Sequence, residues 1–276
     1  MIIFDNHLHL REDGQFINAI KEFKNAGGTH FVLCQLPMVN LVIENKGYRT
    51  VYDITIKMAE KIKSKVNIGV FVTVGPYPVD YIKLKEKFGR KKTIEIMMKG
   101  IDIAKKLCDE KKLIAIGEIG RPHFRVDEQI INDSNKILLY AMERAGDGDI
   151  PIIIHSESTT PENCKELVKM GKKAGLKANK IIKHFSPPLI HKNENYGLFP
   201  SVLASRKNTQ IAFEKGTRFL METDYIDDPL RPGAVLSPKT VPKKTLDLLN
   251  KEIINEDQIY KVHKENPEKI YNIVLD

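Results

Sequence analysis

Eight short apolar runs alternate with longer segments of helical periodicity along this chain, and this order predicts a single-domain (β/α)8 barrel of the TIM type over residues 1–276. The runs are almost continuous in Val, Ile and Leu, which is typical of parallel strands that are buried on both faces. A chain of 276 residues also has the length of one such barrel. A large open sheet would fit the same alternation, but the polar residues described below favour a closed barrel.

The apolar runs and stripes set the expected positions of the strands and helices. The expected strands are Ile2–Asp5, Phe31–Gln35, Ile68–Val74, Leu113–Glu118, Pro151–His155, Lys180–His184, Leu198–Ala204 and Arg218–Thr223. Apolar stripes predict helices that include residues 16–23, 51–62 and 94–108. Further helices are expected at Glu128–Arg144, Pro161–Gly171, Ser205–Lys215, Lys243–Lys251 and Glu256–Lys264. The last two would pack outside the barrel.

The basic composition raises the expectation of an anionic substrate or a nucleic acid. The chain carries 44 Lys and Arg against 36 Asp and Glu, which gives a formal net charge of +8. Lys-rich runs such as Lys61–Lys65 and Lys83–Lys87 lie in expected helices, where a solvated surface explains them more simply.

Cysteine usage and the N-terminal segment bear on the compartment. The three cysteines are far apart and form no CxxC pair, so they predict neither a disulfide framework nor a thiolate metal site. The segment MIIFDNHLHL has no charged leader and no long apolar stretch, and no part of the chain reaches the length of a membrane span. We therefore expect a cytoplasmic protein with no membrane partner, while the sequence sets no oligomeric state.

An H-x-H pair, His7 and His9, follows the first expected strand. Strand side chains repeat with a period of two, so both imidazoles point the same way and can reach one ion. The pair alone is weak evidence for a metal site, because two histidines on one face can simply be surface residues.

Four more potential ligands stand at the ends of other expected strands, and they strengthen the metal hypothesis. Each directly ends or follows an apolar run: Glu118, His155, His184 and Asp224. In a closed barrel the C-terminal ends of the strands meet around one small circle. Imidazole and carboxylate suit Zn²⁺ and similar ions. Independent polar residues at strand ends would explain one such coincidence but not six.

The chain resembles the TatD-related branch of the amidohydrolase superfamily. The matching stretches are FDNHLHL, AIGEIG, PIIIHS, IIKHFS, METD and ENPEKIY, and they occur in the family's order along the whole chain. The resemblance implies a TIM-like barrel that carries a binuclear centre. It implies two divalent ions, with Zn²⁺ expected first and Mn²⁺, Mg²⁺, Fe²⁺ or Ni²⁺ as alternatives.

The resemblance also implies a role for each ligand. His7, His9 and Asp224 are expected to hold one ion. His155 and His184 are expected to hold the second, and Glu118 is expected to bridge both. Such a pair of ions activates water, and Asp224 is placed to take its proton and pass it to the leaving group.

The residues expected to face the substrate depart from the family's pattern. TatD nucleases usually continue Gly-Glu-Ile-Gly with Leu-Asp-Tyr, whereas this chain has Arg121-Pro122-His123. They usually have Arg after the His-Ser of the fifth strand, where this chain has Glu157. Phe185 follows His184 directly, where the family often has Cys-Phe-Ser.

Four residues outside the ligand set are candidates for substrate contact: Arg121, His123, His191 and Arg231. Arg121 and His123 could bind an anion or orient a ligand, or form a surface turn around Pro122. Arg231 could clamp a carboxylate or phosphate, or pair with a neighbouring aspartate. Strand alternation turns Lys183 away from the pocket.

Two loops, Ser186–Gly197 and Tyr225–Pro238, follow strands and are expected at the mouth of the site. His191 and Arg231 lie in them.

Hydrolysis by a two-metal centre is the function that the sequence favours, acting on a small molecule or a nucleic acid. The family resemblance and the basic charge favour phosphodiester cleavage. The altered substrate-side residues favour an amide, lactone or ester of a small metabolite. A barrel that binds metal or nucleic acid without turnover would be expected to lack a ligand, and none is missing.

Overall fold

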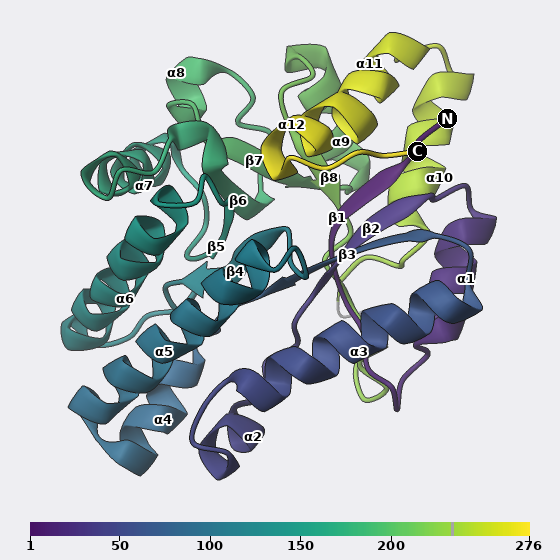
Figure 1. The fold of residues 1–276 in the computed structure, drawn as a ribbon. Coiled ribbons are helices and arrows are strands. Elements are labelled where there is room, and N and C mark those ends of the chain that lie inside the picture. The colour runs from purple at the N-terminus through teal and green to yellow at the C-terminus, as the bar shows by residue number, and fades with distance from the viewer. Residues whose placement is uncertain (233–234) are drawn as a thin grey trace.

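The computed structural model describes residues 1–232 and 235–276, and Figure 1 shows its strands enclosed by helices. Nine strands form one parallel sheet in the order β8-β7-β6-β5-β4-β3-β2-β1-β9. Their bounds are β1 Phe4–His9, β2 His30–Cys34, β3 Gly69–Val74, β4 Ala115–Gly120, β5 Ile152–His155, β6 Ile181–Ser186, β7 Phe199–Leu203, β8 Leu220–Glu222 and β9 Tyr225–Ile226.

The sheet closes on itself through a broken eighth strand. β8 pairs with β7, β9 pairs with β1, and only Thr223 and Asp224 separate β8 from β9. Asp224 has a φ of 48°, which interrupts the strand, and its N–H donates to His7 O at 2.9 Å. The (β/α)8 barrel predicted from the sequence is confirmed, with the single eighth strand divided in two.

Helices follow the strands and pack around the outside of the sheet (Figure 1). Their bounds are α1 Ile17–Asn25, α2 Val39–Glu44, α3 Arg49–Lys65, α4 Asp80–Phe88, α5 Arg90–Asp109, α6 Glu128–Gly146, α7 Pro161–Lys173, α8 Lys192–Asn195, α9 Arg206–Lys215, α10 Thr240–Asn250, α11 Glu256–Tyr260 and α12 Asn266–Tyr271. Two further turns are the 3-10 segment Ala178–Lys180 and the π-helical segment Lys261–Glu265. The expected helix Glu256–Lys264 is therefore α11 continued by the π-helical segment.

Successive residues of a strand pack into two different apolar layers, one on each face of the sheet. Phe31 and Leu33 of β2 belong to the layer between sheet and helices, whereas Val32 and Cys34 belong to a second cluster. That second cluster lies inside the barrel, since strand side chains alternate between faces. The C-terminal residues Tyr271 and Leu275 join it, and Figure 1 shows the two chain ends close together. The C-terminal segment therefore fills the N-terminal end of the barrel and leaves the opposite end for a site.

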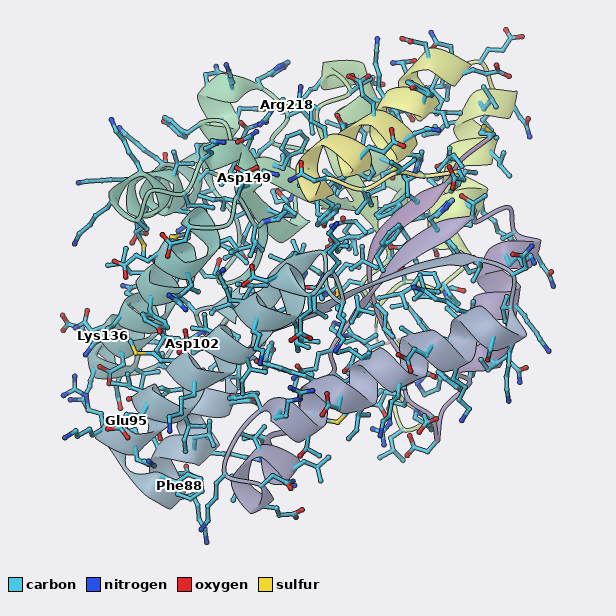
Figure 2. The ribbon with its side chains drawn as sticks, viewed as in Figure 1. Phe88, Glu95, Asp102, Lys136, Asp149 and Arg218 are labelled. Atoms are coloured by element: carbon cyan, nitrogen blue, oxygen red, sulfur yellow. The ribbon has the colours of Figure 1, made fainter. Side chains whose placement is uncertain are left out.

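Charged side chains cover the outer helices. Figure 2 shows Glu95 and Lys136 at the periphery of the molecule, on α5 and α6. Pairs within one helix, such as Lys105 with Asp109 at 2.7 Å, are typical of a solvated helix face. No helix in the described part of the chain is both long and apolar enough to cross a membrane.

Candidate metal centre

β1 carries the two histidines of the H-x-H pair into the barrel mouth. His7 and His9 are both buried, and their Nε2 atoms lie 3.1 Å apart. The Nδ1 of His9 lies 3.1 Å from the carbonyl oxygen of Cys34 on β2. A ring N–H that donates to this carbonyl leaves Nε2 with its lone pair directed inward, which is the state a metal ligand requires.

Glu118 of β4 lies between two pairs of histidines. Its Oε2 is 3.5 Å from His9 Nε2 and 3.8 Å from His7 Nε2. Its Oε1 is 2.9 Å from both His155 Nδ1 and His184 Nε2. One carboxylate thus presents a different oxygen to each pair, which is the arrangement expected of a bridging ligand.

Asp224 joins the first pair from the break between β8 and β9. Its Oδ1 is 3.8 Å from His7 Nε2 and 3.7 Å from His9 Nε2. The buried carboxylate of Asp5 supports this break, because it accepts hydrogen bonds from the N–H and hydroxyl of Thr223 at 3.0 and 2.7 Å. Asp5 of β1 thus fixes the position of Thr223, and with it the left-handed backbone at Asp224.

The donor set fits divalent metal. Two groups of residues could each hold an ion, because all the ligand atoms within a group lie within 4.8 Å of one another. The first group is His7, His9 and Asp224, and the second is His7, Glu118 and His184. His155 Nδ1 adjoins the second group, 3.0 Å from His184 Nε2. So many lone pairs converging in a buried space repel one another unless protons or cations lie between them. Imidazole nitrogen with carboxylate oxygen is the ligand chemistry of Zn²⁺ and similar ions.

The charges within the cluster support each other. Burial alone would favour the neutral form of Glu118, but the facing His184 and His155 hold its pKa well below the usual range. Burial likewise opposes the charged form of His184, and the carboxylates of Glu118 and Glu222 raise its pKa to about 10. Burial raises the pKa of Asp224 to about 6, against the lowering effect of His184 and His7. Bound cations would take over from the imidazolium protons that balance these carboxylates.

Outer residues face the far nitrogens of two of the histidines, and only His155 is hydrogen-bonded there. The Oε1 of Glu222 is 3.6 Å from Nδ1 of His184 and accepts the N–H of Phe185 at 2.6 Å. On the other side, Nε2 of His155 lies 2.8 Å from His123 Nδ1 and 3.3 Å from the hydroxyl of Tyr77. Partners on the far nitrogen fix the tautomer and the ring direction of a ligand histidine.

A cavity of about 490 Å³ opens over the cluster. Its polar lining residues are Tyr77, His123, His155, Ser156, Glu157, Ser158, Lys183, His184, Asp224 and Arg231. Its apolar lining residues are Leu36, Pro37, Phe185 and Ile226. Ile226 and Arg231 of the expected loop Tyr225–Pro238 line the cavity, whereas no residue of the expected loop Ser186–Gly197 does. The volume suits a small ligand or one unit of a polymer.

The four expected substrate residues have different surroundings. His123 and Arg231 line the cavity, and Arg231 Nε also lies 2.8 Å from Asp228 Oδ2. Arg121 is buried away from the cavity lining. His191 caps the N-terminus of α8 and is not among the lining residues.

The guanidinium of Arg121 pairs with acidic side chains. It lies 3.0 Å from Glu157 Oε1 and 2.6 Å from Glu166 Oε1. Its Nε donates to Asn135 at 2.6 Å. These partners join the ends of β4 and β5 to α6 and α7, so they account for the burial of this arginine without a substrate.

Lys183 and Tyr77 were not expected in the site, yet both line the cavity. Lys183 pairs with Ile154 of the layer between sheet and helices, as the expected strand alternation requires. Lys183 nevertheless lines the cavity, and its Nζ donates to the backbone oxygen of His184. Tyr77 follows β3 as the ligands follow other strands, and that position was an available signal.

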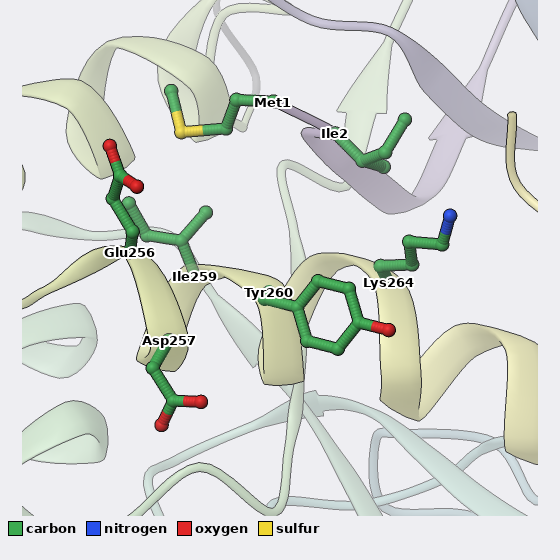
Figure 3. Close-up of a pocket in the computed structure, with 7 residues that line it drawn as sticks. All are labelled: Met1, Ile2, Glu256, Asp257, Ile259, Tyr260 and Lys264. Carbon is green, nitrogen blue, oxygen red and sulfur yellow. The ribbon is translucent and has the colours of Figure 1, made fainter.

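A second hollow, of about 480 Å³, lies where Met1 and Ile2 meet α11 (Figure 3). Glu256, Asp257 and Lys264 contribute its charged groups. None of the six candidate ligands lines it, so the chemistry belongs to the cavity over the histidines.

A parallel barrel with clustered imidazoles and carboxylates at the C-terminal ends of its strands defines the class of barrel metallohydrolases. The comparison with protein families is specific: the family described as TatD-related DNase matches residues 4–272. The chain belongs to the TatD-related DNase family and is a metal-dependent hydrolase. An uncharacterized protein of Methanocaldococcus jannaschii is 38% identical over 99% of this chain and 97% of its own length.

Solved structures share the fold at low sequence identity. A phosphotriesterase homology protein from Escherichia coli, complexed with phosphate in its active site, is 12% identical with a TM-score of 0.62 over 98% of both chains. A TatD family hydrolase from Entamoeba histolytica is 13% identical with a TM-score of 0.61, over 98% of this chain and 99% of the other. An organophosphorus hydrolase from Deinococcus radiodurans is 12% identical with a TM-score of 0.61, over 98% of this chain and 92% of the other.

Proposed function

We propose that this protein is a binuclear metal-dependent phosphodiesterase of the nuclease or phosphoesterase type. The observation that carries the proposal is the position of Glu118, whose two carboxylate oxygens face separate histidine pairs at the barrel mouth. His7, His9 and Asp224 would hold one ion, and His155 and His184 the other. Zn²⁺ is the first candidate for both positions.

Divalent ions at these positions would supply Lewis acidity, which polarises a substrate oxygen and makes water acidic enough to lose a proton near neutral pH. Asp224 would accept that proton and deliver it to the leaving group. The charge of the bound ions would keep its carboxylate ionised and able to accept the proton. His123 keeps the ring of His155 aligned, and the carboxylate of Glu222 favours the charged form of His184.

Family membership and the cationic lining support a phosphodiester substrate. Lys183 and Arg231 line the cavity beside the ligands, and a phosphodiester carries a negative charge at each linkage. The cavity is of mononucleotide scale, so a single linkage or a chain end would enter it rather than an intact duplex. The protein would act as a soluble cytoplasmic enzyme.

Glu157 favours a second candidate, hydrolysis of an amide, lactone or ester of a small metabolite. Its carboxylate lines the cavity where TatD nucleases usually present an arginine, and it would repel a phosphate placed beside it. The apolar wall of Leu36, Pro37 and Ile226 would also receive a small uncharged group. Barrels of this fold include proteins described as lactonases, so the fold does not separate the two candidates.

An activity screen of the metal-loaded protein separates them. The screen compares bis(p-nitrophenyl) phosphate and single-stranded DNA with a panel of lactones, aryl esters and amides, and includes chelator-treated protein. We expect metal-dependent turnover of the phosphodiesters to exceed that of the neutral substrates. Turnover confined to lactones or esters would replace the first candidate by the second, and turnover that survives chelation would contradict both.

A further inference from the structure

Lys183 is a buried lysine and is among the residues that line the candidate reaction cavity. It is 1% exposed and directly precedes the candidate ligand His184. Both residues line the cavity, and Lys183 Nζ donates to the backbone oxygen of His184. The ammonium is therefore in the site and shielded from water, where a charge interacts far more strongly than at the surface.

The ammonium has one hydrogen-bond acceptor, a backbone carbonyl. Nζ donates to the oxygen of His184 at 2.8 Å, and it forms no ion pair with a carboxylate in residues 1–232 and 235–276. An ammonium group has three N–H donors, so two are left for another partner. Buried cations in proteins are normally paired with an anion, so we expect the Lys183 ammonium to bind one.

The nearest acidic residues are engaged elsewhere. Glu222 accepts from Phe185 N and the hydroxyl of Ser201. Glu157 accepts through Oε1 from Arg121 and Asn163, at 3.0 Å each. Neither carboxylate forms an ion pair with the lysine.

Lys180, which directly precedes β6, is a buried lysine with a structural role, and its ammonium is paired within the protein. It is 3% exposed, and its Nζ lies 2.8 Å from the carbonyl oxygen of Ile270 and 3.2 Å from Asp149 Oδ2. This lysine has both an acceptor and a counterion within the protein. Lys183 has only the acceptor.

We propose that Lys183 Nζ binds a phosphoryl oxygen of the substrate beside the metal centre. This inference rests on the proposed phosphodiesterase function and adds a substrate-binding residue outside the ligand set. Nζ sits next to the His184 backbone, so an oxygen that it holds lies close to the group of ligands formed by Glu118, His155 and His184. The lysine then fixes the orientation of the phosphate as it enters.

Binding of inorganic phosphate to the metal-loaded protein tests the proposal. Isothermal titration calorimetry compares the wild type with Lys183→Met, and elemental analysis measures the metal content of each preparation. A charge-assisted hydrogen bond of the usual strength predicts phosphate affinity about 10- to 100-fold weaker in Lys183→Met. Metal content should be unchanged, because lysine is not a ligand.

Two further variants keep the result interpretable. Lys183→Gln retains a donor for the His184 carbonyl and should fold even if the methionine variant does not, with the same loss of phosphate affinity. Lys180→Met removes a buried lysine outside the cavity and should bind phosphate as the wild type does. Unchanged phosphate affinity in a metallated Lys183→Gln protein would overturn the proposal, as would an equal loss in Lys180→Met.

Turnover gives a second readout. With bis(p-nitrophenyl) phosphate, Lys183→Gln should mainly raise KM, while hydrolysis of a neutral aryl ester should change little. If the wild type fails to hydrolyse phosphodiesters but its phosphate binding still depends on Lys183, the proposed function fails and the binding site stands. If the wild type hydrolyses phosphodiesters and Lys183→Gln leaves both KM and phosphate affinity unchanged, the function stands and this inference fails.

Discussion

His123 Nδ1 lies 2.8 Å from His155 Nε2, on the side of the His155 ring opposite to the nitrogen that faces Glu118. A neutral imidazole has one donor and one acceptor nitrogen, so a hydrogen bond donated to His123 leaves Nδ1 of His155 free to bind a cation. The contact therefore links an exposed loop residue to the candidate metal centre.

His123→Phe should weaken metal binding about 10- to 100-fold, the usual effect of removing a partner that orients a ligand histidine. Competition with a chelating dye measures the affinity. His191→Phe is the matched control, because His191 does not line the cavity and should keep wild-type affinity. Equal affinities in the wild type and His123→Phe would show that Tyr77 alone orients His155, or that the ring needs no support.

Arg121→Met should lower the free energy of unfolding by about 1–3 kcal/mol, the cost of losing charged hydrogen bonds at a buried group. It leaves Glu157 and Glu166 without their shared cation. Urea denaturation measures the change. Arg231→Met removes an exposed cation paired with Asp228 and should change stability by less than about 1 kcal/mol. A stable Arg121→Met protein with a sharply raised KM would instead return Arg121 to a role in substrate binding.

Stability should fall as the pH rises through the range in which Asp80 ionises. Burial raises the pKa of Asp80 to about 7, against an ordinary value near 4 in the unfolded chain. Between these values the folded protein holds a proton that the unfolded chain has lost, so unfolding becomes easier as pH increases, by up to about 4 kcal/mol. Asp80→Asn, which keeps an acceptor for the Tyr48 hydroxyl, should reduce this slope in urea titrations between pH 4.5 and 7.5. The slope that remains belongs to groups such as Asp5, whose pKa burial also raises to about 7. A slope identical to that of the wild type would assign the pH dependence to another group.

Asp224→Asn should keep the fold and most of the metal, yet lose roughly 10²- to 10⁴-fold in turnover. Asparagine retains one coordinating oxygen but cannot accept the proton of water. Metal content, melting temperature and turnover are measured on one preparation. Near-wild-type turnover in a fully metallated variant would end the proton-shuttle assignment. A large loss of stability with turnover retained would mean that Asp224 only supports the β8–β9 break.

The candidate ligands could be found in the sequence because regular strands repeat with a period of two. His7 and His9 obey that rule along β1, and both imidazoles reach the barrel mouth. Glu118, His155 and His184 could be found in the same way, since each stands where an apolar run meets polar residues. A closed barrel converts such positions on separate strands into one cluster.

The remaining features depend on irregular backbone and long-range contacts. The left-handed conformation at Asp224 divides the eighth strand and that at Phe185 distorts β6, and nothing in the local sequence marks them. Lys183 lines the cavity although alternation places it on the outer face of β6. The partners of Arg121 lie 36 and 45 residues away, so its pairing with acids could not be predicted from neighbouring residues.

The binuclear centre is the central claim, and counting bound metal tests it most directly. Elemental analysis of zinc-saturated protein, freed of unbound ion, should give about two ions per chain for the wild type. His155→Ala should hold about one, because its Nδ1 faces only the Oε1 side of Glu118 while His7, His9 and Asp224 keep the other position. At most one ion in the saturated wild type, or two in His155→Ala, would contradict the assignment.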